Sequence, residues 1–69
     1  MEIIYVNSSM IRNIGYDLNA STLQVEFNSG VTWQYYDFNE SEWLQFQNAE
    51  SIGKYFIANI RDRYQGSKI

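Results

Sequence analysis

The sequence predicts a single α+β domain over residues 1–69. We expect a three- to four-stranded antiparallel meander, followed by a short helix and a longer C-terminal helix that pack on one sheet face. A chain of 69 residues has room for one domain with a small core. Apolar and polar residues alternate up to residue 38, as along strands, and apolar residues recur every three or four positions beyond it, as along helices.

Two extended segments open the chain. Residues 3–6 are rich in β-branched and aromatic side chains and end at the turn-forming residues 7–9. In residues 10–16, simple alternation places four side chains on one face: Met10, Arg12, Ile14 and Tyr16. Residues 17–21 form the next turn, and we expect Asp17 and the tyrosine before it to hydrogen-bond this loop rather than a ligand.

The next two segments form a hairpin whose register follows from the sequence. Their apolar side chains alternate with polar ones and are Leu23, Val25, Phe27, Val31, Trp33 and Tyr35. A two-residue loop would place Phe27 opposite Thr32 and mix apolar with polar residues on each face. A three-residue loop at residues 28–30 pairs Phe27 with Val31, Val25 with Trp33 and Leu23 with Tyr35. Such a loop needs a left-handed residue, which Gly30 supplies, and it makes one face wholly apolar.

Two helices follow the hairpin. Asn39 is expected to cap the first, with Glu42 returning a hydrogen bond to the cap as in a capping box, and this helix ends near Asn48. Ser51 is expected to cap the second. The apolar stripe of the second helix comprises Ile52, Phe56, Ile57, Ile60 and Tyr64. Residues 66–67 should end this helix, and the last residues should be frayed.

Composition excludes several function classes. Cysteine and histidine are both absent, which removes thiol redox chemistry, the commonest metal ligand and the usual proton carrier near neutral pH. We therefore expect no enzyme activity, no metal site and no cofactor. A net charge of −3 opposes diffuse attraction to nucleic acid. The longest apolar run is far shorter than the roughly 20 residues of a membrane span, and no secretory signal is visible, so we expect a soluble cytoplasmic protein.

The start of the second helix has the composition of a phosphate site. Ser51, Gly53 and Lys54 combine free helix N–H groups, room for close approach and a cation. Arg61 is seven residues after Lys54 and is expected on the same helix face, while Arg12 would add further charge. The structural alternative is a capping serine, a glycine at a packed crossing and a solvated helix face.

The aromatic residues divide into two groups. The hairpin register assigns Phe27, Trp33 and Tyr35 to the core, together with Phe56 of the second helix, in preference to a stacking platform. Tyr36 points to the opposite sheet face, where its ring could stack on a base. A single exposed tyrosine is also ordinary on a protein surface, and this alternative stays open.

The motifs that carry a family resemblance run through nearly the whole chain. They are Ser8-Ser9, Ile14-Gly15-Tyr16-Asp17, Leu23-Gln24-Val25-Glu26-Phe27, Ser29-Gly30, the aromatic-x-aromatic at Trp33 and Tyr35, Ala49, Ser51-Ile52-Gly53-Lys54-Tyr55-Phe56, and Ile60. In this order they resemble the KTSC domain family, a small domain found at the C-terminus of some lysyl-tRNA synthetases and as stand-alone proteins of bacteria and phages. The synthetase context of the family implies RNA binding.

Together these observations lead to two expectations of function. The first is a non-enzymatic KTSC-like module that binds a phosphate-bearing ligand, either RNA or a nucleotide. The alternative is a small protein–protein interaction module, such as a phage-encoded inhibitor or adaptor, which the acidic charge and the abundant tyrosine and tryptophan favour. Self-association into a homo-oligomer would also bury aromatic surface that so small a core leaves open.

Overall fold

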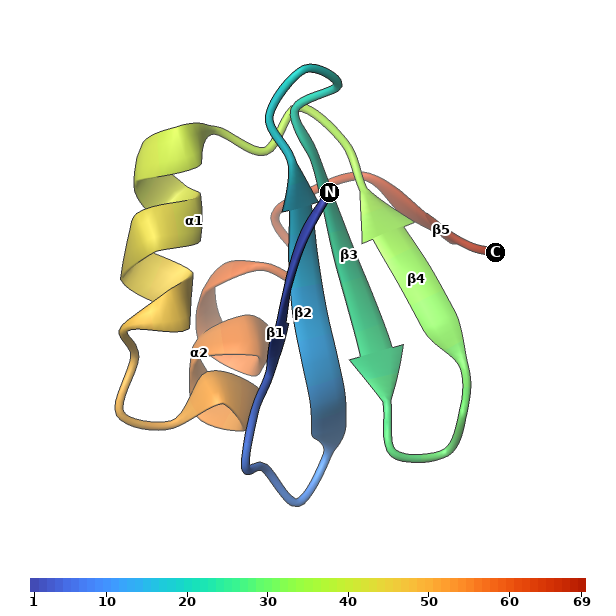
Figure 1. The fold of residues 1–69 in the computed structure, drawn as a ribbon, viewed down its shortest axis with the longest axis vertical. Helices are drawn as coiled ribbons and strands as arrows, with labels where there is room; N and C mark the ends of the chain where they lie inside the picture. The colour runs from blue at the N-terminus through green and yellow to red at the C-terminus, as the bar shows by residue number, and fades with distance from the viewer.

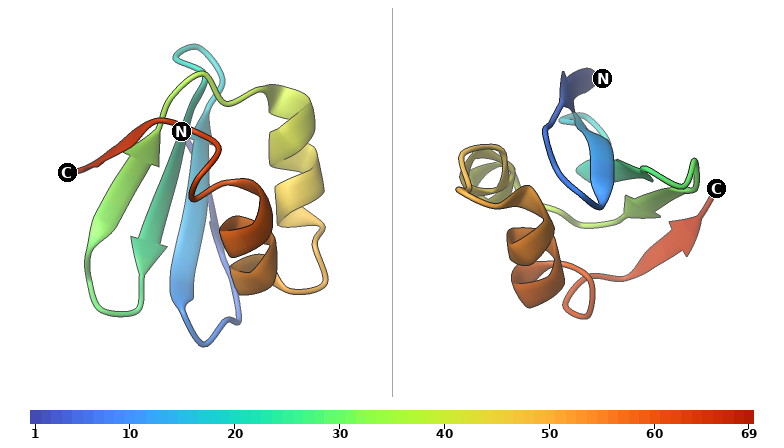
Figure 2. Two further views of the ribbon diagram at one scale, coloured as in Figure 1. Left: turned by 180° about the vertical axis from the view of Figure 1, so that it is seen from behind. Right: turned by 90° about the horizontal axis from the view of Figure 1, so that it is seen from below.

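The computed structural model describes residues 1–69 and contains an antiparallel sheet with two helices on one of its faces (Figures 1 and 2). The elements in chain order are β1 (Glu2–Tyr5), β2 (Ile11–Asp17), β3 (Thr22–Phe27), β4 (Thr32–Tyr35), α1 (Glu40–Gln47), α2 (Ile52–Asn59) and β5 (Gly66–Lys68). The strands lie side by side in the order β1-β2-β3-β4-β5, and each is antiparallel to its neighbour. The sheet therefore has five strands rather than three or four.

The C-terminal residues form an edge strand instead of a frayed helix end. Helix α2 stops at Asn59 and has eight residues, as many as α1, so the expected longer C-terminal helix is wrong. The chain then turns back, and Gly66 pairs with Tyr35 in β4. Ile60 and Tyr64 continue the helical spacing of apolar residues in the sequence, but in the structure they belong to the turn after α2. Within this turn the Tyr64 amide donates to the Ile60 carbonyl over 3.1 Å.

The hairpin of β3 and β4 has the predicted register. Leu23 lies opposite Tyr35 and Val25 opposite Trp33, while the Phe27 amide donates to the Val31 carbonyl over 2.9 Å. Gly30 has φ +95°, the left-handed conformation that the three-residue loop needs. The register prediction is therefore confirmed. It was possible from the sequence because only this loop length places the apolar residues of both strands on one face.

A bulge in β2 changes which residues face the helices. Ile11 lies opposite Phe27 and Asn13 opposite Glu26, so Arg12 is the extra residue on this strand. The prediction from simple alternation is therefore wrong for Ile11 and Arg12, whereas Ile14 and Tyr16 share the core face as predicted. Ile11 is fully buried, whereas Arg12 is exposed. One inserted residue shifts the alternation by one position, which the sequence pattern does not reveal.

The core lies between the helices and the sheet face that they cover. It consists of Ile11, Ile14, Tyr16, Leu23, Val25, Tyr35, Phe38, Trp43, Phe46, Phe56 and Ile60. Asn39 caps α1 by accepting from the Glu42 amide over 2.8 Å. The Glu42 carboxylate does not complete the capping box; it accepts instead from the hydroxyls of Tyr55 and Tyr64. Neither helix has the length and apolar character that crossing a membrane requires.

Candidate functional site

The residues predicted to hold phosphate surround the start of α2. Ser51 is the N-cap, and its Oγ accepts from the Lys54 amide over 3.2 Å. Ile52 and Gly53 are the first two helical residues, so their amides have no acceptor four positions earlier. No other group of the chain accepts a hydrogen bond from either amide. Two backbone donors therefore remain available at the positive end of the helix dipole.

This helix start borders a cavity of about 330 Å³, named here the α2 pocket. One wall is the turn between β1 and β2, residues 7–10, and the other comprises residues 50–54 with Ile57. Figure 1 shows that the start of α2 and this turn are neighbours at the same end of the sheet. The Ser8 Oγ accepts from the amides of Met10 and Ile11, both over 3.2 Å, which leaves its own proton free to donate.

Gly53 is not required by packing at this crossing. A methyl group built there would lie 3.4 Å from the Ser8 Oγ and 3.7 Å from the Met10 Cε, which is ordinary van der Waals contact. Its φ also lies outside the left-handed range. An alanine would therefore fit, and it would fill part of the α2 pocket. The absence of a side chain keeps the pocket open toward the helix amides.

The charges at the α2 pocket are one cation and one anion. The Lys54 side chain is exposed and forms no ion pair. Glu50 belongs to the same wall of the pocket. The local attraction for an anion therefore comes from Lys54, the helix amides and the serine hydroxyls, and it suits one small anionic group rather than an extended polyanion.

Arg61 does not lie on a helix face with Lys54. Because α2 ends at Asn59, Arg61 belongs to the turn that follows, where its Nε lies 3.7 Å from the Asp62 Oδ2. It lines a different cavity. The expected basic stripe along α2 is therefore absent.

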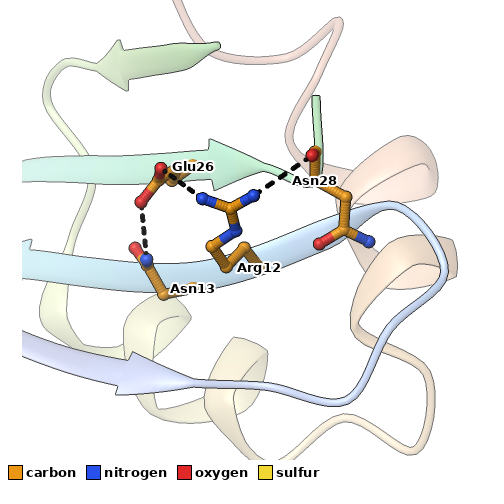
Figure 3. A network of polar contacts seen from close by, with 4 residues as sticks. All are labelled: Arg12, Asn13, Glu26 and Asn28. Atoms are coloured by element: carbon orange, nitrogen blue, oxygen red, sulfur yellow. Dashed lines mark hydrogen bonds and ion pairs between the residues drawn. The ribbon is translucent and has the colours of Figure 1, made fainter. Parts of the chain in front are cut away.

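Arg12 is engaged away from the α2 pocket. Its Nη1 donates to the Glu26 Oε2 over 3.2 Å, and its Nη2 donates to the Asn28 carbonyl over 3.3 Å (Figure 3). Asn13 donates to the other Glu26 oxygen over 2.8 Å. The bulge presents Arg12 and Asn13 together to Glu26, so this arginine stabilises the β2–β3 pairing and adds no charge to the α2 pocket.

Tyr36 also lies apart from the α2 pocket. It follows β4, and its amide donates to the Gln65 carbonyl over 2.9 Å. Its hydroxyl oxygen lies 2.5 Å from the Ser67 Oγ on β5, and the residue is 38% exposed. It lines none of the cavities. The structure thus gives Tyr36 a role in holding β5, which the sequence did not indicate because β5 itself was not predicted.

The four aromatic residues assigned to the core differ in burial. Tyr35 and Phe56 are 4% and 2% exposed, whereas Phe27 and Trp33 are only partly buried and pack against the core from its edge. All four border a cavity of about 580 Å³, named here the aromatic pocket. Its complete lining is Met10, Phe27, Trp33, Tyr35, Phe56, Arg61, Tyr64 and Gly66. Sequence analysis missed this cavity because the turn after α2 and strand β5 complete it.

The polar groups of the tyrosine clusters have structural roles. Burial, followed by the hydrogen bond to Glu42, raises the pKa of Tyr55 to about 12 and also raises the pKa of Tyr64. These phenols stay protonated and tie α2 and the following turn to α1. Tyr16 donates to the Phe38 carbonyl over 2.6 Å in the core, and Asp17 accepts from two amides of its own turn. No group of three His, Cys, Asp or Glu side chains is placed to hold a metal ion.

Comparison with known proteins agrees with this architecture. An uncharacterized protein of Stutzerimonas stutzeri (strain A1501) is 32% identical over 56 residues, which cover 81% of this chain and 79% of that protein. The crystal structure of a KTSC domain protein from Yersinia pestis superimposes with a TM-score of 0.94 at 32% identity, over 99% of this chain and 96% of that chain. The family model described as KTSC domain matches residues 7–64, which include both walls of the α2 pocket. The chain therefore belongs to the KTSC domain family.

Proposed function

We propose that this protein is a non-enzymatic binding module whose α2 pocket holds the terminal phosphate of a nucleotide or of an RNA end. The observation that carries the proposal is Gly53, which neither packing nor backbone conformation requires. Without its side chain, a phosphate can reach the free amides of Ile52 and Gly53. Lys54 supplies the cation at the same rim.

A single phosphate group suits the pocket better than a nucleic-acid backbone. The three cations expected to track a backbone lie in three separate places, and two of them have carboxylate partners. The net charge of −3 further opposes long polyanions. The proposed affinity of the α2 pocket for phosphate therefore comes from local hydrogen bonds at the helix start. Ligands of this class occur in the cytoplasm, where we place the protein.

The proposal includes no catalytic step. The chain contains no histidine or cysteine, and its two perturbed tyrosines near Glu42 are driven toward the protonated form. The α2 pocket offers hydrogen-bond donors and a cation, which bind an anion, but no paired acid and base.

The test is a titration at low salt, observed by NMR through the amide signals of residues 52–54. The probes are mononucleotides and a short oligoribonucleotide, prepared with and without a 5′-phosphate. We expect saturable shifts with the phosphorylated probes only. Lys54→Ala should weaken binding by about tenfold, the effect of one charged hydrogen bond. Lys68→Ala, an exposed lysine on β5, is the matched control and should bind as the wild type does.

Gly53→Ala provides a variant in which stability and binding change independently. The methyl group fits, and alanine is favoured over glycine in helices, so the fold should be at least as stable as the wild type. Binding of the phosphorylated probes should nevertheless weaken, because the methyl group narrows the approach to the amides. If no nucleotide or RNA binds, or if Lys54→Ala is indistinguishable from the wild type, the α2 pocket is not a phosphate site.

A second candidate function, protein–protein interaction, is favoured by the edge strand β1. Its outer edge pairs with no strand, and it exposes Ile3 at 48% and Tyr5 at 77%. An extended segment of a partner could add to this edge. Sedimentation at several concentrations tests whether a second copy occupies it, with Ile3→Lys as the variant that should prevent association. A pull-down from nuclease-treated lysate, performed with the wild type and with Ile3→Lys, tests for other partners.

A further inference from the structure

The aromatic pocket has the size and walls of a small-ligand site. Its volume of about 580 Å³ lies in the range of roughly 300–1,000 Å³ that such sites occupy. Phe27, Trp33 and Tyr35 form the sheet side of the pocket, and Phe56 approaches Tyr35 edge to face with 5.6 Å between ring centroids. Trp33 and Tyr35 stack with their planes only 19° apart. These walls present flat apolar surfaces to a planar occupant.

Tyr35 lines this pocket and carries a hydroxyl without a partner in the chain. The residue is only 4% exposed. No fully buried side-chain oxygen or nitrogen lacks a partner, so this hydroxyl must reach solvent. The aromatic pocket is the cavity that Tyr35 lines. A largely buried residue of the pocket wall therefore retains an unused hydrogen-bond donor with access to solvent.

Arg61 and Tyr35 line the same cavity. Burial raises the pKa of Tyr35, while the positive charge of Arg61 lowers it and the negative charge of Asp62 raises it. The Arg61 side chain is about half exposed, and its contact with Asp62 at 3.7 Å is long for an ion pair between exposed groups. Most of its guanidinium donors thus remain available at the rim of the aromatic pocket.

Gly66 fixes the position of Tyr35. A methyl group built on Gly66 would lie 2.6 Å from the Tyr35 Cδ1 and 2.6 Å from the Gln34 carbonyl oxygen, so the strand β5 rests directly on the ring. The ring also packs edge to face against Phe56. The ring is consequently held in one place, which lowers the entropy lost when a ligand accepts a hydrogen bond from its hydroxyl.

We propose that the aromatic pocket is a second binding site, which takes a planar aromatic group carrying a carboxylate or sulfonate. The rings of the walls accept the planar group, while the Tyr35 hydroxyl and the Arg61 guanidinium donate to the anionic oxygens. The pocket shares only Met10 with the α2 pocket, and this proposal does not depend on the phosphate proposal. The anionic group distinguishes this occupant from an apolar side chain of a second copy of the chain.

The experiment compares two probes that share one ring system. 8-Anilinonaphthalene-1-sulfonate carries a planar naphthalene ring and a sulfonate, and N-phenyl-1-naphthylamine lacks the sulfonate. Both are titrated by fluorescence, with the oligomeric state recorded by sedimentation at the same protein concentration. We expect one site per monomer for the anionic probe, with an affinity about tenfold higher than that of the neutral probe, since the anion gains charged hydrogen bonds.

The variants assign this difference to the two donors. Arg61→Gln should weaken binding of the anionic probe by about tenfold and leave binding of the neutral probe nearly unchanged. Arg63→Gln removes an arginine that is also exposed but does not line the pocket, and this variant should bind both probes as the wild type does. Tyr35→Phe keeps the buried ring and removes only the hydroxyl, so it should weaken the anionic probe by about threefold.

Three outcomes would overturn the proposal. The first is equal affinity of the two probes for the wild type. The second is an anionic probe that responds equally to Arg61→Gln and Arg63→Gln, provided that circular dichroism shows both to be folded. The third is a dimer that dissociates when the probe binds, which would make a second copy the occupant of the aromatic pocket. If Arg61→Gln fails to fold, the selective effect of Tyr35→Phe on the anionic probe decides the question.

Discussion

The cluster of Glu42, Tyr55 and Tyr64 predicts how stability depends on alkaline pH. The Glu42 carboxylate on α1 accepts from the Tyr55 hydroxyl of α2 and from the Tyr64 hydroxyl over 3.1 Å. Burial, and next the hydrogen bond to Glu42, raises the pKa of Tyr55 from 10.0 to about 12. The folded state therefore retains this proton over a range in which the unfolded state releases it.

The sign and size of the effect follow from this difference. Below pH 10 the phenol is protonated in both states, and its interactions stabilise the fold fully. Between pH 10 and 12 only the unfolded state is ionised, so the free energy of unfolding falls as pH rises. A pKa difference of about 2 corresponds to about 2.7 kcal/mol. Because Tyr55 is only partly buried, screening by solvent reduces the expected loss to about 1–2 kcal/mol.

Urea unfolding followed by circular dichroism between pH 8 and 12 measures this loss. The informative quantity is the difference in unfolding free energy between the wild type and Tyr55→Phe, because this difference isolates the Tyr55 hydroxyl. We expect the advantage of the wild type at pH 8 to shrink by about 1–2 kcal/mol by pH 12. Tyr5→Phe is the control, since Tyr5 is 77% exposed, and its profile should follow that of the wild type. A wild-type advantage that stays constant from pH 8 to 12 would refute the coupling between Tyr55 and Glu42.

Four substitutions test particular contacts, each by thermal and urea unfolding. Tyr16→Phe removes the 2.6 Å hydrogen bond to the buried Phe38 carbonyl and should cost about 1–3 kcal/mol; a smaller loss would mean that water replaces the hydroxyl. Gly66→Ala forces a methyl group to within 2.6 Å of β4 and should cost about 1–3 kcal/mol, whereas Gly53→Ala should stabilise by about 0.5–1 kcal/mol, and equal effects would contradict this packing. Gly30→Ala places a side chain at φ +95° and should cost about 1–2 kcal/mol; a neutral effect would indicate a different loop.

The parts of the fold that could be predicted are those set by neighbouring residues. The β3–β4 register follows from one apolar face and one glycine, and the caps Asn39 and Ser51 follow from side chains that accept amides three positions ahead. In each of these cases, the interacting groups lie close together in the sequence, so their spacing carries the information.

The parts that could not be predicted depend on distant partners. The bulge at Arg12 is stabilised by Glu26, fourteen residues away, and simple alternation has no means of showing it. Strand β5 has the sequence Gly-Ser-Lys, which has low β propensity, and it forms because β4 offers a free edge. The same return of the chain moves Arg61 away from Lys54. It also completes the aromatic pocket. The wrong prediction for the last residues therefore led to a wrong placement of Arg61 and to a missed cavity.

The cluster at Gly53 shows what a sequence motif does and does not establish. From the sequence alone, serine, glycine and lysine at a helix start are compatible both with a phosphate site and with a close packing contact. The structure bears on the packing explanation, because a Cβ built on Gly53 would be in ordinary van der Waals contact and would not clash. The steric reading would require a clash like the one at Gly66, where the built methyl group lies at 2.6 Å. Packing therefore accounts for one of these glycines and not for the other.

Helix α2 links the two proposed sites through its own stability. A helix of eight residues is too short to persist alone, so α2 depends on packing of its side chains against the sheet. A ligand in either pocket contacts the sheet side and the α2 side together, and binding only to the folded state raises the unfolding temperature by mass action. Lys54→Ala should reduce the shift caused by a nucleotide but not that caused by the aromatic anion, and Arg61→Gln should do the reverse. If either substitution reduced both shifts equally, the two pockets would act as one site that spans Met10.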